Sequence, residues 1–377
     1  MKSVVVYTRV TADYRLSFYK ELNEILKGKG VSLKVCSGES RAHESLRSCV
    51  EKLPFGMKLH NQYIGKLCWT IGLKSHAKNA DVFISEQASS LIQTYFIFAF
   101  KKFFGVRHTA FWGHGENLNT ENPQWFRSAW KRYWLTKVDW WFAYTMETKR
   151  LLVESGFPSH SITDVQNSID TSELKDALST ESAESIAVRF EEIFGAPRLE
   201  GQRVGIFCAR LVPLKWIPFL LRSIEIMHEK MPDFRMLIIG DGVDRDLVKS
   251  FCITNSWCKW LGAVHGVERV KYFAIADIFI NPGMTGLAVV DAFSAGIPYA
   301  TTNNNIHSPE ISYLENGING IMTDPSEEAF AEAVFSVLNT SKLKKMKKHA
   351  KESGKNYTVE HMAKRYAEGV VALLEKK

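Results

Sequence analysis

Residues 281–298 place a glycine-rich turn before a carboxylate, a combination that suits phosphate and sugar chemistry. Gly283 and Gly286 follow a short apolar run, and the residues after Gly286 have helical propensity. A helix that starts from such a turn presents unpaired N–H groups and the positive end of its dipole, which suits a diphosphate. Asp291, about one turn further on, could accept hydrogen bonds from sugar hydroxyls. The alternative is an ordinary strand, turn and helix with a solvent-facing Asp291.

Two cations, Arg210 and Lys215, occupy the loop after the apolar run 204–208. At the carboxyl end of a parallel strand, an arginine can hold two oxygens of a diphosphate while a lysine acts as a point charge. An isolated loop cation is more often simply solvated. Together with the glycine-rich turn, however, the pair favours a diphosphate site.

Apolar runs of strand length alternate with helical segments along the chain, which is typical of α/β proteins with parallel, doubly wound sheets. The predicted strands are 4–8, 32–36, 81–85, 109–112, 140–144 and 162–165, then 204–208, 236–239, 277–280, 299–301 and 320–322. A polar stretch over 179–185 is typical of a helix and linker. Apolar residues at helical spacing over 358–377 predict a terminal amphipathic helix. We therefore expect two domains, 1–170 with the helix 358–377, and 171–357.

The composition indicates a cytoplasmic protein. With 377 residues, 45% hydrophobic and 24% charged, the chain can form two full cores. Its longest apolar run, 91–100, is far shorter than the roughly 20 residues that span a bilayer. The first seven residues are typical of a strand and not of a signal peptide. The six cysteines have no zinc-ligand spacing, so we expect them to be reduced and structural.

Positive charge is concentrated in the first 170 residues, which hold 23 Lys and Arg against 15 Asp and Glu, whereas the remainder has a net charge of −1. This excess points to an anionic partner, such as a membrane surface or a phosphate-bearing substrate. Aromatic and basic residues over 125–134 and 101–104 suggest peripheral contact with the inner face of the cell membrane. An aromatic core stripe is the alternative. No recognition helix, zinc finger or RNP motif indicates nucleic acid.

Several motifs, in order along the chain, resemble those of the GT-B glycosyltransferases, specifically glycosyltransferase family 4. They are Gln166-Asn-Ser-Ile-Asp170, Arg210-Leu-Val-Pro-Leu-Lys215, Ile239-Gly-Asp-Gly242, Trp260-Leu-Gly262, Ala276-Asp277, the turn 282–287 and Asn316-Gly-Ile-Asn-Gly320. The resemblance implies two Rossmann-like domains facing a cleft, an acceptor domain over 1–170 and a nucleotide-sugar domain over 171–357, with the last helix crossing back. It implies transfer of a hexose or related sugar from a nucleotide-diphosphate sugar to a hydroxyl acceptor, with retention and without a metal or other cofactor. The acceptor would be a polysaccharide or lipid-linked glycan.

The signature of that family is a glutamate, seven residues and a second glutamate. Asp291 matches the second, whose role in the family is to bind the ribose, and aspartate is shorter by about 1.5 Å. The first falls on Gly283, which has no side chain. A bacterial surface-polysaccharide subgroup with a PGxxGL turn and an HSPE segment resembles this chain in that departure. The sugar would then be read by Glu310 or by the backbone of Met284, Thr285, Gly286 and Leu287.

In the first domain, His114 stands between two glycines directly after a predicted strand. Such glycines permit close approach to a ligand, and the position matches a histidine near the transferred sugar in the family. Glu116 is an acid, base or acceptor contact, or else a structural hydrogen-bond partner. Arg9, Tyr14 and Arg15 follow the first strand and are expected contacts to donor or acceptor. The alternative there is a buried Tyr14 and a surface Arg15.

Asp244-Arg-Asp246 has the spacing of a metal motif, but its context favours a helix N-terminus with acidic capping. Two other functions remain open at this stage. One is a nucleotide-sugar epimerase on the same fold, which would need no acceptor. The other is a non-catalytic glycan-binding protein, in which the replacement at Gly283 marks lost activity.

Overall fold

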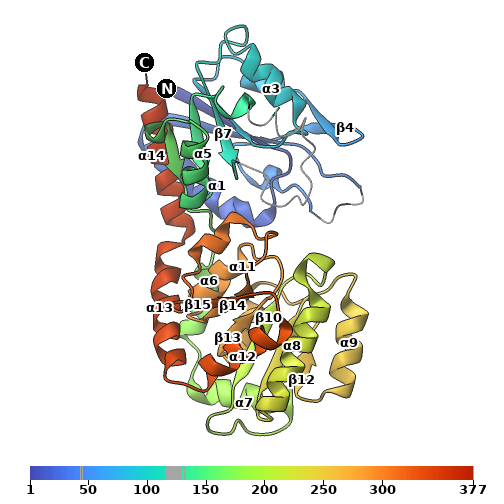
Figure 1. Ribbon diagram of the computed structural model, residues 1–377. Coiled ribbons are helices and arrows are strands. Elements are labelled where there is room, and N and C mark those ends of the chain that lie inside the picture. Colours follow the sequence, from blue (N-terminus) through green and yellow to red (C-terminus); the bar gives the residue numbers. More distant parts are fainter. Residues whose placement is uncertain (43, 45, 116–129, 131–132, 377) are drawn as a thin grey trace. The chain divides into compact units, whose positions relative to one another are not determined.

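The computed structural model describes residues 1–376 apart from 43, 45, 116–129, 131 and 132. The chain divides into two compact units, residues 1–170 with 358–377 and residues 171–357 (Figure 1). Each contains one parallel sheet with helices packed on it, so both domains are Rossmann-like, as the sequence predicts.

The N-terminal domain is built on a seven-stranded sheet in the order β3-β2-β1-β6-β7-β8-β9, in which every neighbouring pair is parallel. The strands are β1 Lys2–Thr8, β2 Val31–Ser37, β3 Gly56–Lys58, β6 Val82–Glu86, β7 His108–Gly113, β8 Trp140–Ala143 and β9 Ile162–Asp164. A separate antiparallel hairpin consists of β4 His60–Ile64 and β5 Leu67–Ile71. The helices are η1 Asp13–Arg15, α1 Leu16–Gly28, η2 Val50–Lys52, α2 Leu73–Ala77, α3 Ile92–Ala99, α5 Met146–Glu154, η3 Ser159–Ser161 and α14 Val359–Glu375.

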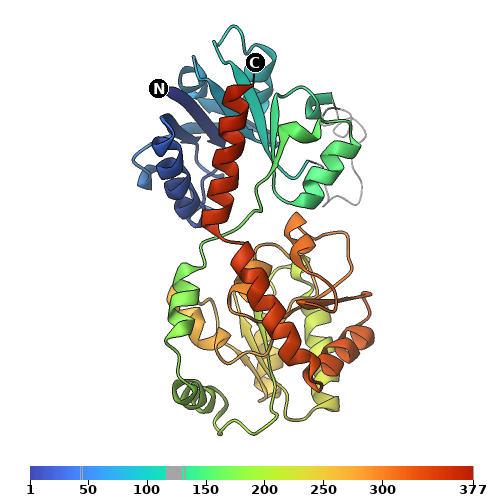
Figure 2. The ribbon, with the colours of Figure 1, turned by 90° about the vertical axis from the view of Figure 1, so that its left-hand side faces the viewer.

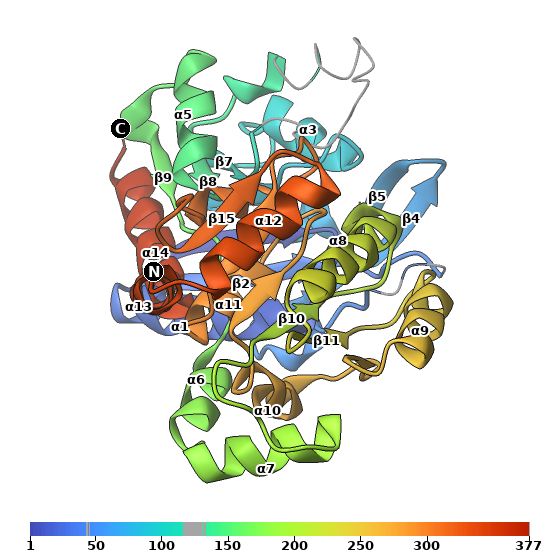
Figure 3. The same ribbon diagram turned by 60° about the horizontal axis from the view of Figure 1, so that its bottom comes forward.

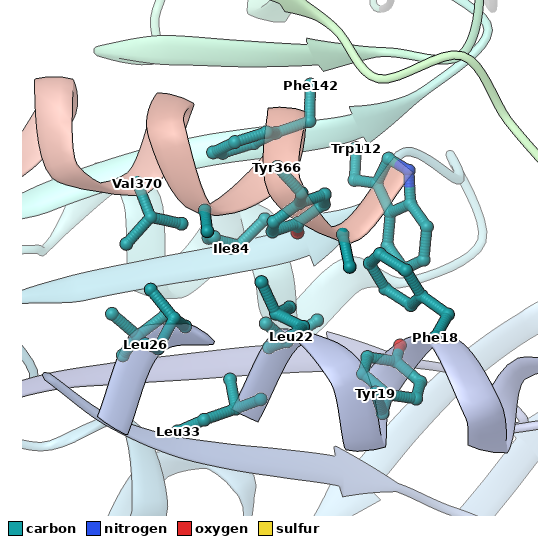
Figure 4. Close-up of a cluster of buried hydrophobic side chains, with 14 of the residues drawn as sticks. Phe18, Tyr19, Leu22, Leu26, Leu33, Ile84, Trp112, Phe142, Tyr366 and Val370 are labelled. Carbon is teal, nitrogen blue, oxygen red and sulfur yellow. The ribbon is translucent and has the colours of Figure 1, made fainter. Parts of the chain in front are cut away.

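The last helix, α14, belongs to the core of this first domain, where it lies beside α1 (Figure 2). Its buried stripe includes Tyr366 and Val370, as its helical spacing predicts. Figure 4 shows Tyr366 between Phe142 of the sheet and Phe18 of α1, and its ring stacks on that of Phe142 at 4.1 Å. A chain segment that is remote in sequence therefore completes one face of the N-terminal sheet.

The C-terminal domain is built on a six-stranded parallel sheet in the order β12-β11-β10-β13-β14-β15. The strands are β10 Val204–Cys208, β11 Arg235–Ile239, β12 Cys258–Trp260, β13 Ile278–Ile280, β14 Tyr299–Thr302 and β15 Gly320–Thr323. The helices are α6 Ser172–Ser179, α7 Ala183–Phe194, η4 Pro213–Lys215, α8 Ile217–Lys230, α9 Arg245–Thr254, η5 Gly266–Arg269, α10 Val270–Phe273, α11 Ala288–Ser294, η6 Pro309–Tyr313, α12 Glu327–Leu338 and α13 Lys342–Asn356. Figure 3 shows α8 and α12 side by side against this sheet.

Every predicted strand is present, with ends that differ by two residues at most. Four strands were missed: β3 and β12, which have only three residues each, and the hairpin strands β4 and β5. All six cysteines are free thiols. Among the described helices we find none with both the length and the apolar character that spanning a bilayer requires.

Candidate active site

The carboxyl ends of β10 and β13 lie next to each other in the second sheet, where the strand order reverses. In an open parallel sheet, the loops that leave the strands at such a point form a crevice that binds ligands. Arg210 lies in the loop after β10, and the turn 281–287 follows β13. The fold therefore brings two of the predicted segments to one edge of the sheet.

The turn after β13 is fastened to η4. The Met284 N–H donates to the carbonyl of Leu214 at 2.8 Å, and Lys215 Nζ donates to the Met284 carbonyl. Asn281 Nδ2 donates to the same carbonyl at 3.2 Å. Lys215 is thus held against the glycine-rich turn.

Gly283 is the point of closest approach between these two segments. A Cβ atom built there would lie 2.4 Å from the Lys215 carbonyl carbon and 2.6 Å from the Leu214 oxygen. Real Cβ atoms essentially never come so near, and both neighbours are backbone atoms. A side chain at this position, such as the glutamate of the family that the motifs resemble, would therefore require the turn or η4 to move.

Lys215 is only 7% exposed. Burial, together with the nearby positive charge of Arg210, lowers the pKa of its ammonium group to about 8. The structure thus brings Arg210 and Lys215 together, and the two cations repel each other. An anion bound beside them would relieve that repulsion and raise the pKa of Lys215 again.

His307 fixes the next residue of the turn. Its Nδ1 accepts from the Thr285 N–H at 2.9 Å, and its Nε2 donates to the Thr302 carbonyl at 2.7 Å. The ring is therefore neutral, in keeping with burial, which lowers its pKa. Because the Thr285 N–H is engaged here, and the Met284 N–H in the bond to Leu214, these two amides are not available to a ligand.

Fewer backbone N–H groups of the turn are therefore open to a ligand than the sequence suggests. Among the described residues, no acceptor is recorded for the N–H groups of Gly286 and Leu287, which immediately precede α11. Glu310 is buried at the start of η6, two residues after Ser308, whose N–H donates to the Thr285 carbonyl at 2.8 Å.

Asp291 faces a partner that the sequence did not reveal. Arg269, at the end of η5, donates to its two carboxylate oxygens at 2.8 and 3.1 Å. Burial raises the pKa of the Asp291 carboxyl group, and the charge of Arg269 opposes this rise. Each carboxylate oxygen keeps a second lone pair that could accept a further hydrogen bond.

In the N-terminal domain, His114 follows β7 directly and its ring meets the edge of the Tyr144 ring, with centroids 4.4 Å apart. Gln87, just after β6, holds the next residue: its Nε2 donates to the Gly115 carbonyl at 2.8 Å and its Oε1 accepts from the Gly115 N–H at 2.9 Å. Gly115 has a φ of +76°, which favours glycine. Gln87 was missed, although its place after a strand was a usable signal.

The alternative interpretation of the segment after β1 was a buried Tyr14 and a surface Arg15, and the structure shows the reverse. Tyr14 is 49% exposed, whereas Arg15 is buried. The Arg15 guanidinium lies over the rings of Tyr14 and Trp112, 5.1 and 5.3 Å from their centroids, and donates to the Ser168 carbonyl at 3.2 Å. A surface Arg15 with a buried Tyr14 is therefore wrong.

Most of the remaining candidate residues lie in ion pairs or outside the described residues. Arg9 forms a 2.7 Å ion pair with Glu44. Glu116 lies outside the described residues, as does most of the segment 125–134. Asp244 precedes α9, where Asp246 pairs with Arg245, although Asp244 makes no side-chain capping bond. Within the described parts of the chain, no cluster of three or more His, Cys, Asp or Glu side chains could hold a metal ion.

Comparison with known proteins bears on the fold and on the sequence of the C-terminal domain. Residues 202–340 match the family described as Glycosyl transferases group 1. The chain is also similar to the alpha-monoglucosyldiacylglycerol synthase of Acholeplasma laidlawii, with 30% identity over 167 residues, which are 43% of this chain and 41% of that protein. The match thus spans less than half the length of this curated relative.

Two solved structures cover nearly the whole chain. HepE of Anabaena, in complex with UDP, superposes with a TM-score of 0.72 over 98% of this chain and all of that one, at 15% identity. A glycosyltransferase from Rickettsia africae gives a TM-score of 0.72 over all of both chains, at 16% identity. The chain therefore has the GT-B fold, and residues 202–340 of its C-terminal domain are similar in sequence to glycosyl transferases.

Proposed function

We propose that this protein is a retaining glycosyltransferase that needs no metal and moves a hexose or related sugar from a nucleotide-diphosphate sugar to a hydroxyl acceptor. The observation that carries the proposal is Lys215, buried beside Arg210 against the turn 281–287, at the point where ligands bind in such sheets. Family 4 is the subgroup that we propose, on the motifs given above.

In the proposed reaction, negative charge develops on the departing diphosphate, and the site must stabilise that charge. The bond between the anomeric carbon and the diphosphate oxygen breaks, the acceptor oxygen bonds to the same face of that carbon, and the acceptor proton passes to the departing oxygen. Arg210 and Lys215 stabilise the diphosphate as its negative charge develops, assisted by the N–H groups of Gly286 and Leu287. His114 contacts the sugar, and Glu310 is the side chain that replaces the absent glutamate in reading it.

The names of the relatives support the substrate classes. HepE was also solved with UDP-glucose, and the Acholeplasma relative is named as a synthase of a glucosylated diacylglycerol. We therefore propose a UDP-sugar donor and a lipid-linked or polysaccharide acceptor, with the protein on the cytoplasmic side of the membrane.

Incubation with a panel of nucleotide sugars, with and without lipid-linked glycan, tests this function. We expect a glycosylated product and free nucleotide diphosphate only when both substrates are present. Conversion of the donor alone into an epimer would favour the epimerase, and glycan binding without turnover would favour a non-catalytic protein. Either result would overturn the proposal.

UDP affinity should fall as pH rises above 8. Lys215 loses its proton near that pH in the free protein, and a bound diphosphate raises the pKa again, so binding requires proton uptake in this range. The fall should approach about tenfold per pH unit. Titration calorimetry between pH 7 and 9.5 measures it. Lys215→Arg should abolish the dependence because arginine stays charged; an equally steep fall in that variant would contradict the assignment.

Asp291→Asn should weaken UDP binding by about tenfold and remove the preference for UDP over 2′-deoxy-UDP. A site that hydrogen-bonds a hydroxyl through a charged group discriminates against an analogue that lacks it. Comparison of the two dissociation constants measures this preference. Glu225→Gln, which removes an exposed partner of Arg222 in the same domain, is the matched control and should leave both constants unchanged. An unchanged ratio in Asp291→Asn would show that Asp291 does not read the ribose.

A further inference from the structure

The hairpin β4–β5 has the reverse of the usual amphipathic pattern. Its inward-facing Asn61 and Thr70 are buried, and Thr70 donates to the Asn61 amide oxygen at 2.6 Å and bonds the Tyr7 hydroxyl at 2.6 Å. Its outward side chains are instead largely apolar: Ile64, Leu67, Trp69 and Ile71. Ile64, at the tip, is 77% exposed.

The exposed apolar surface continues onto α3, which lies beside β5 (Figure 1). The rings of Trp69 and Phe96 are 6.5 Å apart, and those of Phe96 and Phe100 are 4.9 Å apart. Phe103, in the turn that follows, is 81% exposed. We call this surface, formed by Ile64, Leu67, Trp69, Ile71, Phe96, Phe100 and Phe103, the hairpin patch. Exposed apolar patches of this kind mark interaction sites.

The charges around the hairpin patch are all positive along the chain segments that form it. No Asp or Glu occurs between Lys52 and Ala80, or between Gln87 and Gly115. Lys66 lies at the exposed hairpin tip and Lys102 beside Phe103, while the Lys74 ammonium lies over the Trp69 and Phe96 rings, 4.8 and 4.5 Å from their centroids. Aromatic and aliphatic side chains interspersed with lysines match the boundary between anionic headgroups and acyl chains.

We propose that the hairpin patch docks this protein on an anionic membrane. Its apolar side chains enter the headgroup boundary while Lys66, Lys74 and Lys102 pair with lipid phosphates. The hairpin patch includes part of the segment 101–104 that the sequence suggested. Most of the other suggested segment, 125–134, is not described, and Trp134 packs on Tyr95 at 5.2 Å. An anionic membrane is thus a partner of the proposed function, and this proposal rests on the lipid-linked acceptor of that function.

Flotation with vesicles of phosphatidylcholine alone, or mixed with phosphatidylglycerol, tests the surface. The wild-type protein should float with the mixed vesicles and less so in high salt, because screening weakens the lysine contribution. Ile64→Ser combined with Phe103→Ser should lower the partition coefficient at least about tenfold, since each substitution removes an exposed apolar side chain that the membrane would bury. Lys66→Glu combined with Lys102→Glu should lower it by a similar factor.

The matched control is Ile253→Ser combined with Lys249→Glu, on α9, where Ile253 is 75% exposed. This control should float like the wild type. Failure of the wild type to float, equal flotation of the patch variants, or a dimer in sedimentation that the patch variants abolish would each overturn the proposal. UDP binding, measured by thermal shift, should be the same in all these variants as in the wild type. Absence of UDP binding in the wild type would instead count against the proposed function.

Discussion

Replacement of Lys215 by methionine is expected to lower the rate of sugar transfer about 100- to 1000-fold while leaving the protein folded. Loss of one preorganised donor to a developing negative charge has effects of this size. The methionine side chain is similar in length and fits a buried site. It also removes a charge whose burial is unfavourable, as the lowered pKa of Lys215 indicates.

Initial rates at saturating donor measure the effect of Lys215→Met, and a melting curve should confirm that the variant is folded. Arg210→Ala should reduce the rate similarly, because both cations would act on the same diphosphate. Arg222→Met is the matched control on α8, where the side chain is exposed and paired with Glu225. Surface pairs contribute at most about 1 kcal/mol, so this control should transfer sugar at a nearly normal rate. Nearly normal rates in both Lys215→Met and Arg210→Ala would contradict the diphosphate assignment.

Gly283→Ala is expected to destabilise the C-terminal domain by about 1–3 kcal/mol and to abolish most donor binding. The added methyl group would overlap the Lys215 and Leu214 backbone, so the turn must move away from η4. That movement breaks the bond from the Met284 N–H to Leu214 and withdraws the turn from Lys215. Denaturant unfolding and UDP titration measure the two effects.

Gly286→Ala is the matched control for stability, because the nearest atom to its added Cβ is the Ser308 Oγ at 3.7 Å, an ordinary contact. It should change the free energy of unfolding by less than about 0.5 kcal/mol. Gly283→Glu, which restores the residue type of the family, should be worse than Gly283→Ala and should not raise activity. If Gly283→Ala were as stable as the wild type and bound UDP normally, the turn would not be fastened as described.

The parallel sheets could be predicted because each buried strand is a short apolar run, and such runs are local features. The hairpin β4–β5 could not, since most of its outward-facing residues are apolar, while Thr70 bonds inward to Tyr7 and to Asn61. Its alternation was therefore compatible with either face, and nothing local identified which one is buried.

For the site, the sequence was sufficient to select Arg210, Lys215 and Asp291, because cations and carboxylates next to glycine-rich turns have a recognisable chemistry. Their roles stay predictions until the variants are measured. Arg269 was missed because an arginine without a local motif shows its role only through a partner elsewhere in the chain. Gln87 was missed although its place directly after β6 was a usable signal.

The sequence by itself determined the two Rossmann-like domains and the segments that hold the candidate residues, because strand and helix periodicity depend on near neighbours in the chain. Only the tertiary structure decided why Gly283 has no side chain, which amides of the cradle are already engaged, and which partner Asp291 has. These depend on distances between segments such as η4, the turn 281–287 and η5, which packing alone sets. A side chain at position 283 is thus incompatible with the close contact that holds the turn against η4.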